Sequence, residues 1–147
     1  MRVELDFSGL DKKIEAILNS SDTKLEMNNA FARYMDPYVP MDSGTLAGSG
    51  MANVTPEYVE YNTPYAHYQY EGIVYGPNIP ITRDGVIVGF YSIPNQPKTP
   101  TGNEIQYSTE KHPLATHHWD QAMMENRGEE FTAELNRIVC RRYNSGR

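Results

Sequence analysis

The sequence predicts an α+β fold in which an antiparallel sheet packs against N-terminal and C-terminal helices and a β-hairpin protrudes. Three observations support this prediction. Apolar residues recur at helical spacing between residues 10 and 34, and again between residues 115 and 139. Between these regions, segment 79–93 has the apolar flanks and the central Asp84-Gly85 pair of a hairpin, because Asp-Gly readily adopts the positive φ angles of tight turns.

Size, charge and cysteine content restrict the classes of protein to which the chain can belong. We expect residues 1–147 to form a single domain with a hairpin and loop insertion at about 73–111. The formal net charge of −6 disfavours a free-standing nucleic-acid binder, which needs clustered Lys and Arg. No apolar run has the length of a signal peptide or a membrane span, so we expect no membrane partner. The single cysteine, Cys140, excludes an internal disulfide and fits folding in a reducing cytosol.

The N-terminal third is predicted to be helical after a short strand over Arg2–Phe7, where polar and apolar residues alternate. Ser8–Asp11 has the spacing of a capping box, and the helix that it starts runs to about Asn19. Residues 20–22 restart the helix. Two proline-containing pairs then end the helical pattern, Asp36-Pro37 and Val39-Pro40.

The middle of the chain is predicted to contain short elements and loops. Tyr58–Tyr61 has the composition of a strand, and residues 65–72 are predicted to form a helical turn that ends at Gly72. Segment 94–102, with three prolines, is predicted to be a loop. The hairpin over 79–93 and this loop are the part of the chain where we expect contact with a partner.

Tyrosine is over-represented, with eleven residues against one Trp and four Phe. Tyr combines a large apolar ring with a polar tip and is common at protein–protein interfaces. Aromatic cross-strand pairs within an ordinary sheet explain such a cluster equally well. The candidate subunit interface consists of six central tyrosines and three apolar hairpin residues: Tyr58, Tyr61, Tyr65, Tyr68, Tyr70, Tyr75, Val86, Val88 and Phe90.

The C-terminal helical region is predicted to open at His112-Pro113, since Pro is acceptable in a first turn. It carries two apolar stripes whose centres lie roughly 160° apart on a continuous helix. Either one helix has two apolar faces or the helix breaks near residues 126–128, and the break is favoured because Gly128 weakens a helix interior. The stripes are Ala115, Trp119, Ala122 and Met123, followed by Phe131, Leu135, Ile138 and Val139.

No arrangement of residues predicts catalysis, a cofactor or a metal site. His112, His117 and His118 lie near Asp120, but adjacent positions on a helix diverge by about 100°, and no HExxH motif or cysteine ligand accompanies them. The sequence also lacks a nucleophile elbow and a phosphate-binding loop. Four arginines near the C-terminus either complement a helix end or contact DNA or an acidic partner: Arg137, Arg141, Arg142 and Arg147.

Segment 39–46, VPMDSGTL, resembles the VPvDTGxLrxS signature of the HK97 gp10-like and related minor capsid proteins of tailed phages. Residues 59–72 resemble the family's later YAxyvExG element, and residues 112–119 resemble its last helical region. All three blocks occur in the family's order. The motif residues are interpreted as a helix-to-strand junction, because Pro40 and Gly44 suit a turn, and they comprise Val39, Pro40, Asp42, Gly44 and Leu46.

The resemblance implies a non-enzymatic virion protein of the neck between head and tail, assembled in the host cytoplasm. It implies a ring around the DNA channel, with a homohexamer preferred and a twelvefold ring second. Its expected partners are other copies of itself, adjacent head-closure or connector proteins, tail-terminator or tail proteins, and DNA that passes without sequence-specific binding. The alternatives are a tail terminator or head-closure protein, a small metal-dependent hydrolase, and a monomeric host binding module.

Overall fold

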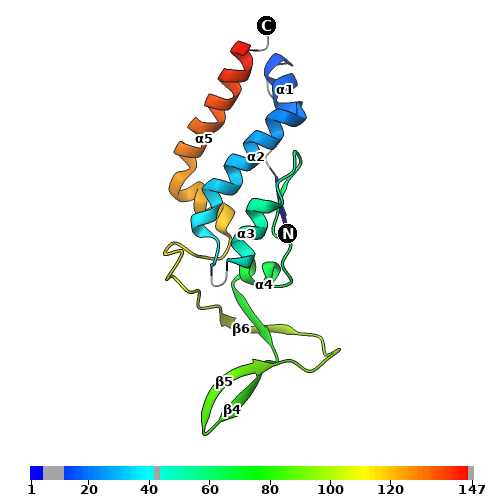
Figure 1. Cartoon of the computed structure of the whole chain (residues 1–147), viewed down its shortest axis with the longest axis vertical. Coiled ribbons are helices and arrows are strands. Elements are labelled where there is room, and N and C mark those ends of the chain that lie inside the picture. Colours follow the sequence, from blue (N-terminus) through cyan, green and yellow to red (C-terminus); the bar gives the residue numbers. More distant parts are fainter. Residues whose placement is uncertain (5–11, 42–43, 146–147) are drawn as a thin grey trace.

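The computed structural model describes residues 1–4, 12–41 and 44–145, and Figure 1 shows an elongated subunit with helices at one end and strands at the other. We call the first part the helical body and residues 73–104 the arm. The body contains β1 (Arg2–Val3), α1 (Lys12–Asn19), α2 (Ser21–Met35), the 3-10 helix η1 (Asp36–Tyr38), α3 (Thr45–Ala52), β2 (Val59–Glu60), α4 (Ala66–Glu71) and α5 (Trp119–Ser145). The arm contains β3 (Ile73–Gly76), β4 (Ile79–Arg83), β5 (Val86–Tyr91) and β6 (Thr99–Glu104). The fold is therefore α+β, as predicted.

The predicted helix boundaries in the N-terminal third are confirmed. α1 ends at Asn19, α2 begins at Ser21, and α2 gives way at Asp36 to a 3-10 turn that contains Pro37. Proline ends the α-helix here because it has no N–H to donate to the preceding turn. Of the predicted strand over 2–7, Arg2–Val3 form β1 and Glu4 is not part of the strand, while residues 5–7 and the predicted capping box at residues 8–11 lie outside the described residues.

The predicted antiparallel pairing is confirmed, but the described strands do not join into one sheet. The described strands form three separate two-stranded antiparallel pairs: β1 with β2, β3 with β6, and β4 with β5. The helices bury their apolar faces against one another, α2 against α5, so no larger sheet is needed to cover them. The predicted loop over 94–102 is also partly wrong, because Thr99–Gly102 belongs to β6, where Thr101 Oγ1 donates a hydrogen bond to Val74 O at 2.7 Å.

The predicted break in the C-terminal helix is confirmed. α5 is interrupted at Arg127, whose φ of −133° and ψ of 18° are not helical. The break turns both predicted apolar stripes towards the same core, and Trp119, Met123, Phe131 and Ile138 are all buried.

The predicted start of this helix at His112-Pro113 is wrong, because α5 begins at Trp119. The preceding backbone donors have partners elsewhere in the body: Thr116 N–H donates to Tyr38 O and His118 N–H donates to Tyr70 O. These long-range hydrogen bonds replace the ones that a helix would supply to the same amides.

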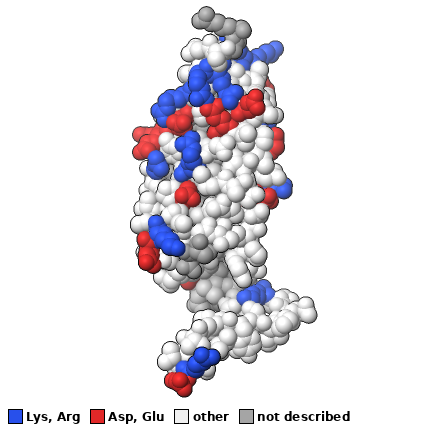
Figure 2. Space-filling model, in the orientation of Figure 1, with Lys and Arg blue, Asp and Glu red and all other residues white. Residues whose placement is uncertain are grey.

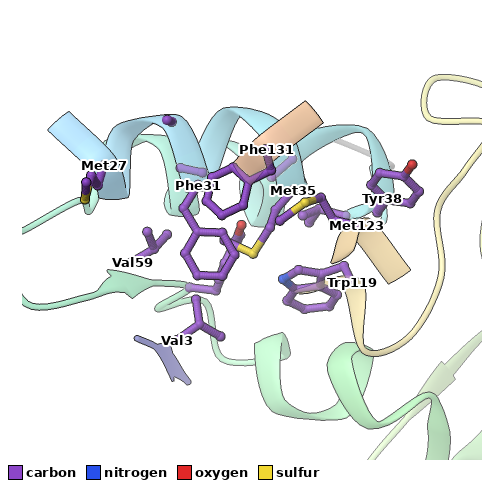
Figure 3. Close-up of a cluster of buried hydrophobic side chains, with 14 of the residues drawn as sticks. Val3, Met27, Phe31, Met35, Tyr38, Val59, Trp119, Met123 and Phe131 are labelled. Carbon is purple, nitrogen blue, oxygen red and sulfur yellow. The ribbon is translucent and has the colours of Figure 1, made fainter. Parts of the chain in front are cut away.

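The core lies between α2, the two halves of α5 and the β1–β2 pair, as Figure 3 shows. Phe31 and Phe131 stack with ring centroids 5.4 Å apart. Trp119, which is 0% exposed, makes edge-to-face contacts with Tyr61 at 5.1 Å and Tyr70 at 5.0 Å. Aromatic packing of this kind closes the end of the body from which the arm extends.

Candidate interaction surfaces

The hairpin of the arm is built as the sequence predicts. Asp84 and Gly85 form the turn between β4 and β5 with φ angles of +53° and +79°, which suit a tight turn that follows the twist of the strands. Beyond the turn, Ile81 pairs with Gly89 and Thr82 pairs with Ile87, so Val88 is the extra residue of a β-bulge.

The bulge distributes apolar residues over both faces of the hairpin. Directly opposed residues share a face and successive residues alternate. Phe90 therefore lies on the face of Pro80, Thr82 and Ile87, whereas Val86 lies on the opposite face with Arg83. We call the first of these the Phe90 face.

The three hairpin residues expected at an interface are all exposed: Val86 by 62%, Val88 by 58% and Phe90 by 62%. The structure adds four more exposed large apolar residues that the prediction omitted, Ile81, Ile87, Tyr91 and Ile93. The continuous apolar run over 86–91 could have indicated these residues. Polar and apolar residues alternate along a strand with one buried face, but not along a strand with two apolar faces. Figure 2 shows that charged side chains gather on the body and leave most of the arm uncharged.

Two of the six central tyrosines, Tyr61 and Tyr70, pack against Trp119 in the helical body. Tyr61 is 2% exposed and belongs to the core, so its ring is not on the surface. Tyr70 is half-buried and its hydroxyl donates to Asp120 Oδ1 at 2.8 Å. Burial, followed by the hydrogen bond to Asp120, raises the pKa of Tyr70, and burial also raises the pKa of Tyr61. Both rings stay protonated at neutral pH, as structural tyrosines do.

The other four tyrosines differ in exposure. Tyr65, at the start of α4, is 68% exposed. Tyr68 and Tyr75 pack together at the root of the arm with ring centroids 4.7 Å apart, and Tyr58 lies beneath the Arg2 guanidinium at 4.1 Å. Tyr65 is thus the tyrosine of this set with the most surface to offer a partner.

The sequence motif at 39–46 forms a junction between two helices, so the predicted helix-to-strand junction is wrong. Val39 and Pro40 are buried after η1, Gly44 has a φ of +88°, and α3 begins at Thr45. The positive φ of Gly44 confirms the left-handed turn expected of this glycine. Leu46 lies in the first turn of α3 and packs against the core, while Asp42 lies outside the described residues.

A cavity whose described lining residues carry no formal charge lies at the junction of the body and the arm. Its volume is about 540 Å³, and it is lined by the described residues of segment 40–46, by residues 63–69 around the start of α4, and by residues 105–108 after β6. The Tyr107 hydroxyl donates to Gln69 O across one wall, and burial raises the pKa of Tyr107 to about 12. We call this cavity the junction groove. Its described lining residues are Pro40, Met41, Gly44, Thr45, Leu46, Thr63, Pro64, Tyr65, Gln69, Ile105, Gln106, Tyr107 and Ser108.

The C-terminal arginines expected to contact DNA or an acidic partner have partners within the subunit. Arg142 binds Glu26 through two nitrogens, at 2.7 and 2.9 Å, and Arg141 pairs with the same carboxylate. Arg137 pairs with Glu134 one turn away. The contacts of Arg141 and Arg142 with Glu26 fasten α5 to α2, while the Arg137 and Arg141 side chains remain 65% and 63% exposed. Arg147 lies outside the described residues.

The histidines near Asp120 are distributed among different contacts. His112 Nδ1 lies 2.7 Å from Val39 O, and its Nε2 lies 3.7 Å from Asp36, whose pKa is raised by burial against the opposing effect of His112. His117 and His118 contact each other through their Nδ1 atoms at 2.7 Å, and His118 also faces Glu71 at 3.8 Å. Within residues 1–4, 12–41 and 44–145, no three His, Cys, Asp or Glu side chains are placed to hold a metal ion.

No described helix is both long and apolar enough to cross a lipid bilayer.

Comparison with known proteins identifies the family. A family model described as "Minor capsid protein" matches residues 1–137. No curated protein and no solved structure matches the chain. Since the family match covers most of the sequence, the chain belongs to the minor capsid protein family and is a structural component of a phage virion.

Proposed function

We propose that the chain is a ring-forming subunit of the neck of a tailed phage, where it joins head to tail around the DNA channel and performs no bond-making chemistry. The arm is the observation that carries this proposal. Seven large apolar side chains of segment 81–93 are each 44–62% exposed. Monomeric soluble proteins rarely expose a contiguous apolar patch larger than a few hundred Å². A virion subunit with such a surface is expected to cover it by assembly.

The hydrogen bonding of the arm supports the same proposal. β4 pairs with β5 alone among the described strands, so each has one edge free of strand pairing. A two-stranded hairpin is marginally stable by itself in water. Contact with a neighbouring subunit would supply both the missing burial and a partner for the free edges.

The position of the arm supports a closed ring. The arm extends from one end of the body (Figure 1), so it presents a surface unlike the rest of the subunit. A contact between two different surfaces repeats from copy to copy and closes into a ring when the rotation permits. We propose six copies, by analogy with the sixfold symmetry of phage tails, with twelve as the second choice, and adjacent head-closure, connector or tail proteins above and below.

Charge supports a passage through which DNA slides without sequence-specific binding. The chain has a net charge of −6, and the described C-terminal arginines are paired with carboxylates of the same subunit. A channel wall with a net negative charge and paired arginines attracts the phosphate backbone of DNA weakly, because DNA binding requires clusters of unpaired Lys and Arg.

The mass of the native assembly tests the ring. Native mass spectrometry of the wild-type protein should give a closed oligomer, whereas Phe90→Asp should give a monomer that is still folded by circular dichroism. Leu114→Asp is the matched control, because Leu114 is 55% exposed but lies outside the arm, and it should leave the oligomer intact. A wild-type protein that stays monomeric, both at high concentration and in the presence of the other virion proteins, contradicts the proposal.

Imaging of particles tests the location. Phage that lack this chain should accumulate filled heads without tails, and a gold label on the chain should appear between head and tail. Normal tailed particles in its absence would overturn the proposed role, and a label on the tail end or on the head vertex would favour a tail terminator or a head-closure protein instead.

A further inference from the structure

We infer that the junction groove of one subunit is the receptor for the Phe90 face of the hairpin of the next subunit. This inference rests on the proposed ring and specifies how neighbouring copies are joined. It assigns different roles to two surfaces of the same chain, with the hairpin as donor and the groove as acceptor.

The hairpin has the chemistry of a donor. The seven exposed apolar side chains of segment 81–93 are divided between its two faces, and on the Phe90 face Phe90 and Ile87 are 62% and 55% exposed. A standard protein–protein interface buries about 800 Å² on each partner. The Phe90 face therefore supplies an apolar part of one side of such an interface, and it carries no formal charge, because Arg83 lies on the opposite face.

The junction groove has matching properties. Its volume of about 540 Å³ is within the range of roughly 300–1,000 Å³ for pockets that bury apolar ligands. None of its lining residues, all of them in the described part of the chain, carries a formal charge. An uncharged hairpin face therefore enters without leaving a charge unpaired, which would otherwise cost several kcal/mol.

The rim of the groove offers an aromatic anchor. Tyr65 is 68% exposed although it lines the cavity. Tyrosine is enriched among the residues that contribute most of the binding energy at interfaces, since its ring packs on an apolar partner while its hydroxyl can form a hydrogen bond. Burial of Tyr65 against the incoming hairpin accounts for the exposure of this ring in a single subunit.

The geometry directs the hairpin to another copy. The groove lies where the body meets the arm, and the β3–β6 pair separates it from the β4–β5 hairpin, which lies at the far end of the arm in Figure 1. A contact from the hairpin of one subunit to the groove of the next is heterologous, so each subunit donates once and accepts once. This is the type of contact that a ring requires.

Mixing two defective variants tests the inference. Phe90→Asp removes the donor and keeps the groove, whereas Tyr65→Asp blocks the groove and keeps the donor. Each variant alone should run as a monomer in native mass spectrometry. An equimolar mixture should give a 1:1 heterodimer, because one intact hairpin then meets one intact groove and neither end can extend further.

Three outcomes would overturn the inference. These are a mixture that stays monomeric, a Tyr65→Asp protein that still forms the wild-type oligomer, and Tyr65→Asp particles that form rings but fail to bind another virion protein. The proposed function is tested separately by the wild-type mass: if the wild type forms rings while any of these outcomes occurs, the ring stands and the groove assignment fails. Two controls accompany these measurements. Circular dichroism checks that each variant is folded. Gln106→Lys, at an exposed residue of the same groove, is a second variant that blocks the groove.

Discussion

Trp119 and Phe131 in the helical body are 0% exposed, whereas Val86 and Phe90 in the arm are each 62% exposed. The two regions contain the same classes of apolar residue, but the body covers them with its own helices and the arm leaves them to solvent. Burial of a large side chain stabilises a protein by about 1.5–3 kcal/mol. The body therefore obtains its stability from its own sequence, and the arm must obtain much of its stability from another chain.

The largest effect is expected at the centre of the body. Trp119→Ala removes a fully buried ring that packs on Tyr61 and Tyr70, and should lower the free energy of unfolding by about 3–5 kcal/mol. Urea denaturation of the dissociated subunit measures this loss. Leu114→Ala, at an exposed position, should change stability by less than about 0.5 kcal/mol. A loss below about 1 kcal/mol for Trp119→Ala would mean that the body has no fixed aromatic core.

A smaller effect is expected where α3 meets the core. A Cβ atom added at Gly50 would lie 2.1 Å from the buried Tyr61 ring, so Gly50→Ala should cost about 1–3 kcal/mol. Gly48 is the matched control in the same helix. A Cβ there meets nothing within 4 Å, so Gly48→Ala should stabilise the protein by about 0.5–1 kcal/mol. Equal effects of the two substitutions in thermal unfolding would contradict the close contact between α3 and Tyr61.

The ion pairs between α2 and α5 should contribute less. Glu26→Gln removes the carboxylate that Arg141 and Arg142 share, and should cost about 0.5–1 kcal/mol at low salt. The loss should shrink in 1 M salt, where the Debye length falls to about 3 Å. Glu130→Gln, which removes a more exposed pair with Arg127, serves as the control and should have a smaller effect. If the loss at Glu26 is independent of salt, packing rather than charge holds the two helices together.

The smallest effect on stability is expected in the arm. In the dissociated subunit, Phe90→Ala should change the free energy of unfolding by less than about 0.5 kcal/mol, because the ring is already exposed. The same substitution at the buried Phe131 should cost about 3–5 kcal/mol. A large loss at Phe90 in a monomer would show that the arm packs against its own subunit, and would remove the contrast between the two regions.

Much of the local structure was predictable from the sequence, because its causes are local. Pro37 ends α2, Asp84-Gly85 turns the hairpin, and Gly44 adopts a positive φ, each for reasons contained in one or two residues. The break in α5 at Arg127 was predictable from the angle between two apolar stripes. The apolar arm was foreseen in part, through Val86, Val88 and Phe90.

Other features of the site were not predictable, because they depend on partners far away in the chain. Tyr61 and Tyr65 are four residues apart and chemically identical, yet Trp119 packs on the first, whereas the second is 68% exposed. The junction groove likewise combines residues from three separated segments.

The sequence by itself therefore determined where helices end, where the hairpin turns and which family the motif at 39–46 resembles, since capping, proline geometry and backbone sterics act over a few residues. Tertiary structure alone decided that α5 begins at Trp119, that β6 pairs with β3 and that the hairpin remains uncovered. Each of these depends on which distant atoms satisfy a backbone hydrogen bond or remove an apolar side chain from water, and residues that meet only after folding make that choice.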